Sequence, residues 1–411
     1  TSTFDLAGFN QTLRSLSRFN SGNAATITNT NGAPSILTLN VLAADGSGGG
    51  RNTGDYTFGG VITGNLAVVK NGAGTQTLSG ANTYLGGTTV NLGTLKLGAA
   101  NALGGDIGYN GALTVNGGKM DINGVGNLAI GALAGSGGVI TDTGFQLGSS
   151  VLSTYSVTSS AYAGSLNDGN FRTLSLYKDG TGILTLTGAS TYSGVTKVFE
   201  GALSIGNNTA LGSPVGATIV SNGAAVQVAG GITSAEPFTV SGTGLSATSG
   251  VLQNLSGDNT LSGAVTVTST RTINVGGSNL TIAGNITGTG GLTKTGNGNL
   301  SLIGNNTFSG DLTVNAGTVS VGALGAANIG TGTLHLNGGG LRFDYQSLNG
   351  FTGTGTSIYT GAPASTAITD NFAVLHSSDL SNPDRIGDNT TKGFVGKVYL
   401  PAGTFSFSKN F

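Results

Sequence analysis

Residues 70–98 read KNGAGTQTLSGANTYLGGTTVNLGTLKLG, and the same pattern recurs twice more without a gap. The second copy, residues 178–206, reads KDGTGILTLTGASTYSGVTKVFEGALSIG, and the third, residues 294–322, reads KTGNGNLSLIGNNTFSGDLTVNAGTVSVG. The copies begin at Lys70, Lys178 and Lys294, so the two intervals between them are similar in length but not equal. A degenerate relative, LSGDNTLSGAVTV at residues 255–267, keeps the apolar and glycine positions. A long internal repeat of this kind indicates a chain built from stacked units.

Each copy contains short stretches in which apolar and polar residues alternate. In the second copy, residues 184–187 read LTLT, Gly188 ends the alternation, and residues 203–205 (LSI) form a further stretch. Alternation with a period of two is typical of β-strands, and the polar middle residue of LSI is expected to point outward. Turns such as Asn71-Gly72 supply the positive φ angles that tight corners need. Short strands that are interrupted so regularly predict an all-β parallel β-helix, a solenoid whose coils stack and bury their apolar side chains.

The composition excludes several classes of protein. Glycine accounts for 76 of the 411 residues, charged residues for 8%, and the formal net charge is −1. So few basic groups cannot neutralise phosphates, and nucleic acid is not an expected partner. The chain has no cysteine, which removes zinc-thiolate and redox chemistry and fits bacterial export. It also has no apolar run of about 18 residues, so no transmembrane helix is predicted. The chain starts at Thr1 without a methionine, which suggests a processed product whose targeting segment has been removed.

The three copies resemble the passenger-associated repeat of bacterial autotransporter adhesins, which reads roughly K-x-G-x-G-x-L-x-L-x-G-x-N-T-Y-S-G-x-T-x-V-x-x-G-x-L-x-V-G. The second copy departs from it at Ser190, where asparagine is usual, and at Glu200, where a small or polar residue is usual. The opening FDLAGFNQTLRSLS, residues 4–17, also resembles a coil common in these passengers. The resemblance implies a right-handed β-helix over residues 1–340 in a secreted or bacterial cell-surface protein.

The last part of the chain, residues 341–411, has a different composition and holds 10 of the 26 Phe and Tyr residues. Within it, GFVGKVYLPAGTFSFSKNF (residues 393–411) resembles the opening strands of a PA14-type β-sandwich, a module often associated with glycans. The match ends before the acidic pair that carries ligand contacts in that family, so no binding residue is carried over. The alternatives are the beginning of such a sandwich and a strand-rich cap on the open end of the solenoid.

Catalytic residues are not apparent. Polysaccharide cleavage by two carboxylates needs the two groups about 5 to 10 Å apart. Asp121 and Asp142 are separated in the sequence by roughly the length of one coil and could stack on neighbouring coils. The sequence places no Lys or Arg beside them, however, and solvated corner residues are expected. His335 and His376 are isolated, and His335 stands at the outward position of a strand. No enzymatic activity is therefore predicted.

One acidic cluster is a weak candidate for binding Ca²⁺. Asp379, Asp384 and Asp388 lie in SSDLSNPDRIGDN, where oxygen ligands at such spacing suit a hard cation. Arg385 beside them favours a plain salt-bridged loop. No other cofactor is expected.

The recurring lysines and aromatic residues of the repeat have structural interpretations. The lysines are expected to cover apolar surface with their stems and to keep their ammonium groups in water: they are Lys70, Lys178 and Lys294. The aromatic residues are expected to pack at a coil corner, with a sugar platform as the minor alternative: they are Tyr84, Tyr192 and Phe308. Asn82 and Asn306 are expected to bond their own backbone or the next coil.

These observations favour an extracellular structural or adhesive protein: a surface adhesin, a component of a biofilm matrix or a self-associating fibre subunit. Its expected partners are further copies of itself, joined end to end or laterally, or cell-surface and matrix glycans. One alternative is a glycan-binding adhesin that acts through residues 341–411, and another is a polysaccharide-cleaving β-helix enzyme. A glycan array and the activity of Asp121 and Asp142 variants would discriminate among these.

Overall fold

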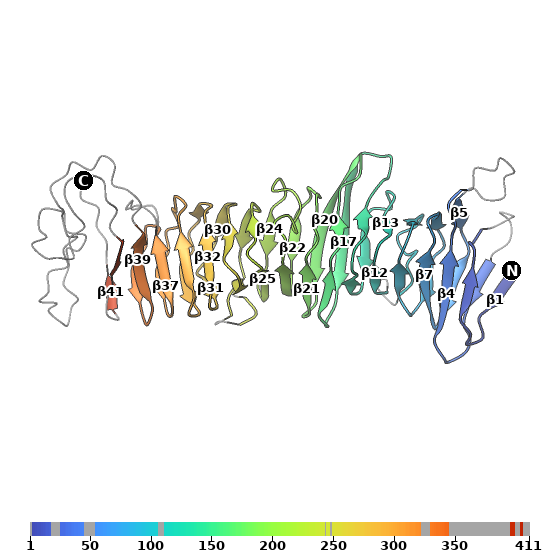
Figure 1. The fold of residues 1–411 in the computed structure, drawn as a ribbon, viewed down its shortest axis with the longest axis horizontal. Coiled ribbons are helices and arrows are strands. Elements are labelled where there is room, and N and C mark those ends of the chain that lie inside the picture. The colour runs from blue at the N-terminus through green and yellow to red at the C-terminus, as the bar shows by residue number, and fades with distance from the viewer. Residues whose placement is uncertain are drawn as a thin grey trace, which may run out of the picture. The chain divides into compact units, whose positions relative to one another are not determined.

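The computed structural model describes residues 2–17, 25–44, 54–105, 111–242, 244–246, 249–321 and 329–344, and the backbone of residues 395–398 and 403–405. These residues form short β-strands joined by turns, and no α-helix occurs among them. The chain divides into two units, Thr1–Ile219 and Val220–Phe411. In each, strands at equivalent places in successive coils pair in parallel, which confirms the predicted all-β parallel solenoid (Figure 1).

Unit 1 has three columns of parallel strands at its start. One column contains β1 (Ser2–Asp5), β3 (Ala25–Thr28), β6 (Val61–Gly64) and β9 (Thr83–Tyr84). The second contains β2 (Gln11–Leu13), β4 (Ser35–Asn40), β7 (Leu66–Asn71), β10 (Thr88–Val90), β12 (Leu113–Val115) and β15 (Leu133–Ala134). The third contains β5 (Asp55–Phe58), β8 (Thr75–Leu78), β11 (Thr94–Leu97), β13 (Lys119–Asp121), β16 (Val139–Thr141) and β19 (Ser165–Leu166).

The later coils of unit 1 add two further runs of paired strands. One run, in order, is β14 (Leu128–Ile130), β17 (Gly148–Tyr155), β20 (Arg172–Asp179) and β22 (Thr196–Val198). The other is β18 (Ser160–Tyr162), β21 (Ile183–Leu186) and β23 (Gly201–Ile205). Strand β24 (Thr218–Val220) spans the boundary between the units in the sequence.

Unit 2 repeats this arrangement. One run contains β27 (Phe238–Val240), β30 (Val265–Val267) and β33 (Ile286–Thr287). A second contains β25 (Ala224–Ala229), β28 (Leu252–Ser256), β31 (Arg271–Val275), β34 (Leu292–Thr295), β36 (Leu312–Val314) and β38 (Leu334–Leu336). A third contains β26 (Thr233–Ser234), β29 (Asn259–Leu261), β32 (Asn279–Ile282), β35 (Asn299–Leu302), β37 (Thr318–Val321) and β39 (Gly340–Asp344). After β39, β40 (Val395–Val398) pairs antiparallel with β39, and β41 (Gly403–Phe405) pairs antiparallel with β38.

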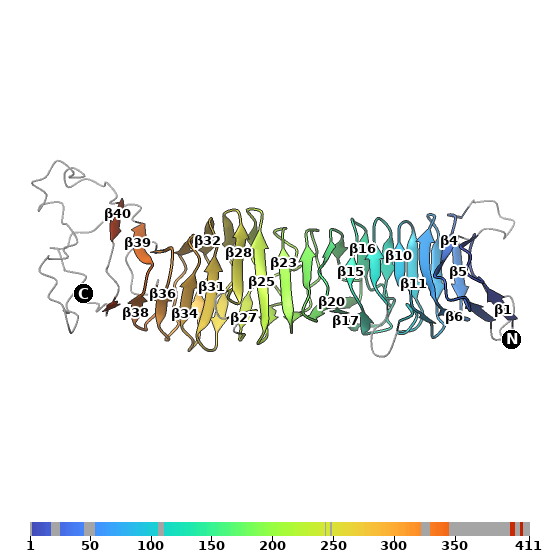
Figure 2. The ribbon, with the colours of Figure 1, turned by 90° about the horizontal axis from the view of Figure 1, so that it is seen from below.

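The coils differ in length although the strands stay in register. Val68 pairs with Thr88, and Thr88 pairs with Leu113, so the second of these two coils is the longer one. The strands of successive coils within each unit nevertheless stay aligned in columns (Figure 2). Loop length can therefore vary from coil to coil without disturbing the core.

The core of each coil follows the period-two alternation of the sequence. In β7, the side chains of Leu66, Val68 and Lys70 are all fully buried, and the residues between them are half-buried. The same alternation is seen in β20 and β34. The alternation directs the middle residues of two third strands, Ser204 and Ser320, to the outer side of the sheet, and both are nevertheless buried. A parallel sheet can be covered on its outer side as well as on its inner side.

The repeat lysines are buried, which corrects the expectation that their ammonium groups lie in water. The Nζ atom of Lys70 donates hydrogen bonds to three carbonyl oxygens, those of Asn71 (2.9 Å), Gly72 (2.7 Å) and Leu92 (3.0 Å). The equivalent three bonds occur at Lys178 and Lys294, at 2.6 to 3.2 Å. Two acceptors lie on the following turn and the third lies one coil later, so each lysine fastens the corner of its own coil to the next.

Burial lowers the pKa of Lys70, Lys178 and Lys294 to about 8. The corner has no room for a side chain opposite the lysine. A Cβ on Gly93, where φ is +68°, would collide with the Gly72 oxygen and would lie 2.5 Å from the Gly74 oxygen. The lysine and glycines of the repeat are thus parts of one compact corner.

The repeat aromatic residues pack at a coil corner, as expected. Tyr84 and Tyr192 are fully buried, and their hydroxyl groups bond those of Thr88 (2.5 Å) and Thr196 (2.6 Å), four residues later. In the third copy Phe308 replaces the tyrosine, and Leu312 replaces the threonine. Both members of the pair change together, so no buried hydroxyl group is left without its partner. Buried rings cannot form a sugar platform, so that alternative is wrong for these positions.

The repeat asparagines bond neighbouring coils: Asn82 bonds the next coil, as predicted, and both Asn82 and Asn306 also bond the preceding one. The Oδ1 atom of Asn82 accepts the N–H of Ile62 at 2.7 Å, and its Nδ2 atom donates to the carbonyl of Ala102 at 2.6 Å. Asn306 accepts the N–H of Ile286 at 2.8 Å. Each asparagine therefore replaces a backbone partner where a strand has ended.

Candidate functional site: a clamped ribbon with an apolar tip

Two strands of unit 1 extend well beyond their neighbours. β17 and β20 each have eight residues and pair along their whole length, whereas β14 and β22 on either side have three residues each. β14 pairs only with residues 152–154 of β17, and β22 only with residues 176–178 of β20. Residues 148–151 and 172–175 form a two-stranded parallel ribbon that projects past the adjoining strands (Figure 1).

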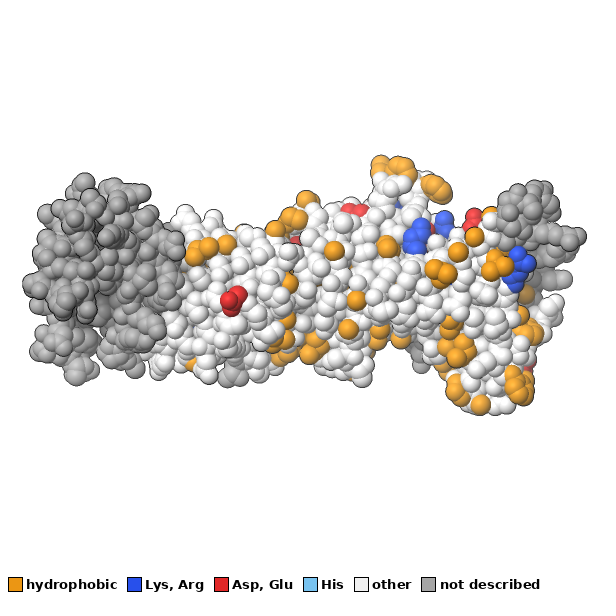
Figure 3. Space-filling view, in the orientation of Figure 1, with side chains coloured by type: hydrophobic (Ala, Val, Ile, Leu, Met, Phe, Trp, Pro, Cys, Tyr) orange, Lys and Arg blue, Asp and Glu red, His pale blue; other side chains and the backbone are white. Residues whose placement is uncertain are grey.

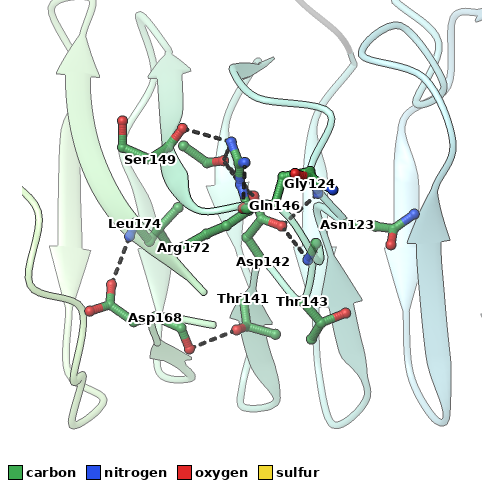
Figure 4. Close-up of polar contacts among 12 residues, drawn as sticks. Asn123, Gly124, Thr141, Asp142, Thr143, Gln146, Ser149, Asp168, Arg172 and Leu174 are labelled. Atoms are coloured by element: carbon green, nitrogen blue, oxygen red, sulfur yellow. Dashed lines mark hydrogen bonds and ion pairs between the residues drawn. The ribbon is translucent and has the colours of Figure 1, made fainter. Parts of the chain in front are cut away.

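A ribbon of this kind needs support from side chains. Two strands alone are marginally stable in water, and parallel pairing is the less stable kind. Arg172, the first residue of β20, provides the support. Its Nε atom contacts Asp142 Oδ2 at 2.9 Å, Nη1 donates to the carbonyl of Gln146 at 3.1 Å, and Nη2 donates to that of Ser149 at 2.9 Å. One guanidinium group thus ties β20 to Asp142 and Gln146 in the segment before β17 and to Ser149 in β17 itself (Figure 4).

The carboxylate of Asp142 is completely buried and has several donors. Its Oδ1 atom accepts the N–H groups of Gly124 (2.6 Å) and Gly144 (2.9 Å), and its Oδ2 atom accepts the Ser150 hydroxyl and Arg172 Nε. The Arg172 side chain is 11% exposed. We call Asp142, Ser150 and Arg172 the clamp. Removing one partner of a buried ion pair typically costs about 3–5 kcal/mol, because the other charge stays buried without compensation.

The structure corrects the expectation for the two aspartates. Asp142 is paired with an arginine, and Asp121 is also buried, where it accepts the N–H groups of Asn123 and Thr143 at 3.0 Å and the Thr143 hydroxyl at 2.6 Å. Asp168, further along the chain, holds the N–H of Leu174 at 2.7 Å. All three carboxylates accept hydrogen bonds at corners between coils. Asp121 and Asp142 are buried there and are not solvated corner residues, while Asp168 is half-buried.

The end of the ribbon carries large apolar side chains. Phe145 is 81% exposed, Leu147 is 84% exposed and Phe171 is 48% exposed. The N–H of Gly148 donates to the carbonyl of Phe171 at 3.2 Å, which brings the two loops together. Hydrophobic side chains gather on the top of the projection in the space-filling view (Figure 3). We call Phe145, Leu147 and Phe171 the tip. Clustered exposed apolar groups of this size mark surfaces that contact a partner.

The other predicted site residues do not join this site. His335 lies at the outward position of β38, as expected, and its Nε2 atom lies 3.2 Å from Asp311 Oδ2. The pKa of Asp311 is lowered, first by the N–H of Thr333 and then by His335. The remaining candidates lie outside the described residues: they are His376, Asp379, Asp384 and Asp388. In the part of the chain that the structure describes, no three His, Cys, Asp or Glu side chains are grouped to hold a metal ion.

Neither the tip nor the clamp is predicted from the repeat pattern. The available signal was local: FQL at residues 145–147 and FR at residues 171–172 put bulky residues among the glycine, serine and threonine that occupy other corners. The pairing of Arg172 with Asp142 joins distant positions of the sequence, and their separation follows from loop lengths that the repeat does not fix.

Among the described residues, no helix is long and apolar enough to cross a membrane. The family model of the passenger-associated-transport-repeat matches residues 68–97, 176–205 and 292–321. The adhesin BmaC autotransporter of Brucella suis biovar 1 (strain 1330) is 32% identical over 344 residues, which cover 77% of this chain and 9% of that protein. The chain therefore spans less than a tenth of the length of this curated relative. No solved structure matches the chain.

Proposed function

We propose that this chain, which carries three passenger-associated-transport repeats, is an extracellular adhesive segment that binds its target through the tip of the clamped ribbon. The relative in Brucella suis is named as an adhesin, which supports an adhesive role. The observation that carries the proposal is the tip itself, an exposed apolar cluster held by a buried ion pair.

The energetics of the clamp favour a functional explanation. Buried ion pairs contribute little net stability compared with apolar packing, so stability alone does not account for Asp142 and Arg172. Burying each side chain of the tip against a partner would contribute about 1.5–3 kcal/mol before the costs of association. A fixed tip also loses less conformational entropy on binding than a flexible loop does.

Binding without catalysis is the activity that we propose. The carboxylates of Asp121 and Asp142 are engaged by backbone N–H groups and, for Asp142, by Arg172. Such groups hold corners together and are unsuited to transfer protons to a substrate, because their protonation would break the corner.

The adhesive role can be tested with beads that carry the protein. Retention of the beads on cultured cells under flow is measured for the wild type and for the variant F145S/L147S/F171S. The control is Val215→Ser, which removes an equally exposed apolar side chain (84%) elsewhere in unit 1. The proposal expects retention to fall at least tenfold for the triple variant and to stay unchanged for the control. Equal retention of all three proteins contradicts it.

Self-association is the alternative function, and the C-terminal strands bear on it because they would cover strand edges that could otherwise pair with another copy. β40 and β41 pair antiparallel with β39 and β38, next to the last parallel pairings described in unit 2. This pairing supports a cap that covers exposed strand edges, and it favours the cap over a separate PA14-like sandwich. Truncation after residue 344 is then expected to expose the edges and produce oligomers in light scattering. A truncated chain that stays monomeric contradicts the cap. Secretion to the cell surface or into a biofilm matrix, and glycans as partners, remain parts of this proposal.

A further inference from the structure

A second group of aromatic residues lies on the outer face of unit 1, at the opposite end of β17 and β20 from the tip. In the strand register, Ser153 pairs with Tyr177 and Tyr177 pairs with Lys197, on three successive coils. Two residues further on, Tyr155 pairs with Asp179. Phe199 follows β22, and its N–H donates to the carbonyl of Lys178 at 2.8 Å. Two short outward-facing columns therefore stand side by side.

Tyr177 contacts two of its neighbours in these columns. The rings of Tyr177 and Phe199 meet edge to face, with centroids 5.5 Å apart and an angle of 82° between the planes. The Nζ atom of Lys197 lies 5.1 Å from the centroid of the Tyr177 ring. Tyr177 thus contacts both Phe199 and Lys197 of the next coil. Tyr155 and Phe199 remain 40% and 41% exposed.

We propose that this surface, which we call the aromatic platform (Tyr155, Tyr177, Asp179, Lys197 and Phe199), binds an extended neutral polysaccharide. A pyranose ring has faces rich in C–H groups and edges rich in hydroxyl groups. Exposed aromatic rings suit the faces, because C–H groups are attracted to the negative face of a ring. The charged groups of Asp179 and Lys197 and the hydroxyl of Ser153 suit the edges, because charge-assisted hydrogen bonds are the stronger ones.

The spacing of the rings favours an extended chain. Tyr155 pairs with Asp179, and Phe199 directly follows Val198, which pairs with Lys178. Tyr155 and Phe199 therefore occupy the same place in coils that are two apart. Adjacent strands lie about 4.8 Å apart, so the two side chains emerge about 9.6 Å apart. This separation is close to the length of one disaccharide in a fully extended β-1,4-linked chain. Such a chain running across the strands would place every second sugar over a ring.

The charges of the platform argue against other ligands. Asp179 and the exposed Glu200 accompany the single ammonium group of Lys197, so a nucleic acid or an acidic polysaccharide would be repelled. A purely apolar partner would have to bury these charged groups without compensation. A neutral chain of hydroxylated rings is not repelled by the carboxylates, and its hydroxyl groups can form hydrogen bonds with the charged groups.

The test is retention of the whole chain on insoluble polysaccharides. Cellulose and chitin are extended β-1,4-linked chains, and amylose is a helical α-1,4-linked chain. We expect retention on cellulose or chitin and none on amylose. The variant Y155T/F199T, which keeps strand-compatible residues, should lose at least tenfold in apparent affinity. Phe9→Thr, which removes an aromatic residue that is 70% exposed outside the platform, is the matched control and should bind like the wild type.

Several outcomes would overturn the inference: no retention on cellulose or chitin, equal retention on amylose, or unchanged retention of Y155T/F199T. Lys197→Gln provides a second variant that leaves both exposed rings in place, and it should weaken retention because Tyr177 loses its cation. The platform does not depend on the tip. F145S/L147S/F171S should keep its polysaccharide binding even if it loses adhesion to cells, so the failure of one proposal is distinguishable from the failure of the other.

Discussion

The Nε atom of Arg172 lies 2.9 Å from the Oδ2 atom of Asp142, and this contact joins two corners from different coils of unit 1. A solenoid normally pairs each residue with its equivalent one coil away. Here an ion pair supplements that pairing where β17 and β20 extend beyond the adjacent strands β14 and β22. The consequence is a projecting ribbon with a fixed, apolar end.

Replacement of Arg172 by methionine should loosen the ribbon while the rest of unit 1 stays folded. Asp142 would keep a buried charge without its cation, at a cost of about 3–5 kcal/mol. Hydrogen exchange should become faster at the amides of residues 148–151 and 172–175 and stay unchanged in β7 and β10. The double variant R172M/D142N should recover part of the loss, since no charge is then left unpaired. Unchanged exchange in Arg172→Met would show that the clamp does not support the ribbon.

The buried lysines make stability depend on pH in a defined window. Burial lowers the pKa of Lys294, like those of Lys70 and Lys178, from 10.5 to about 8. Between these values the unfolded chain binds more protons than the folded chain, so the free energy of unfolding rises with pH. Burial raises the pKa of Tyr84 and Tyr162 above 10.0, so stability falls again at higher pH, where the unfolded tyrosines ionise.

Thermal unfolding followed by circular dichroism should therefore show a melting temperature that increases from pH 8 to pH 10 and decreases beyond it. Lys294→Met removes one of the three titrating lysines and should reduce the rise by about one third, if the three contribute equally. A melting temperature that falls steadily from pH 8 would contradict the burial of the charged lysines.

The aromatic corner predicts a coupling between two residues. Tyr84→Phe should cost about 1 kcal/mol, because the buried Thr88 hydroxyl loses its 2.5 Å bond to Tyr84 and keeps only the carbonyl of Leu103 at 3.4 Å. Thr88→Leu likewise removes the hydrogen-bond partner of the buried Tyr84 hydroxyl. The double variant Y84F/T88L copies the pair found at Phe308 and Leu312 and should be more stable than the sum of the single changes predicts. A double-mutant cycle by urea denaturation measures this coupling, and additive effects would refute it.

Two glycines with similar backbone angles should respond differently to alanine. A Cβ on Gly93 (φ +68°) would collide with the carbonyl oxygens of Gly72 and Gly74, whereas Gly223 (φ +78°) has no atom within 4 Å of that position. Gly223→Ala incurs only the left-handed backbone strain, about 1–2 kcal/mol. Gly93→Ala adds a collision between coils and should lower the melting temperature much further. Equal shifts for the two variants would show that the corner can relax.

The repeat predicted the coil fold and the inward residues because its period-two alternation is local and each coil repeats it. Asn82 and Tyr84 were placed correctly for the same reason. The state of the lysines was not predictable, because sequence does not show that three carbonyl oxygens converge on the Nζ atom of Lys70. A lysine at an inward position of a strand can bury its ammonium group or extend it to solvent, and the sequence pattern is the same in both cases.

The clamp and the platform depend on contacts between coils of unequal length. Arg172 and Asp142 belong to different coils, and so do Tyr177 and Phe199. The separation of Arg172 and Asp142 follows from a loop whose length the repeat does not specify, so that pair cannot be found by counting a fixed period. Tyr177 and Phe199 both lie within the second repeat match, residues 176–205, and their contact depends on which side chains occupy those positions in this copy. The exposed positions of Phe145 and Leu147 depend on the same loops.

Adhesion of beads under flow, compared for the wild type, F145S/L147S/F171S, Arg172→Met and Val215→Ser, tests most directly whether a clamped tip makes the contact. The tip and clamp variants should both lose at least tenfold in retention, while Val215→Ser should match the wild type. Wild-type retention by the tip variant would contradict the proposed contact. Wild-type retention by Arg172→Met alone would contradict the role of the clamp in presenting it.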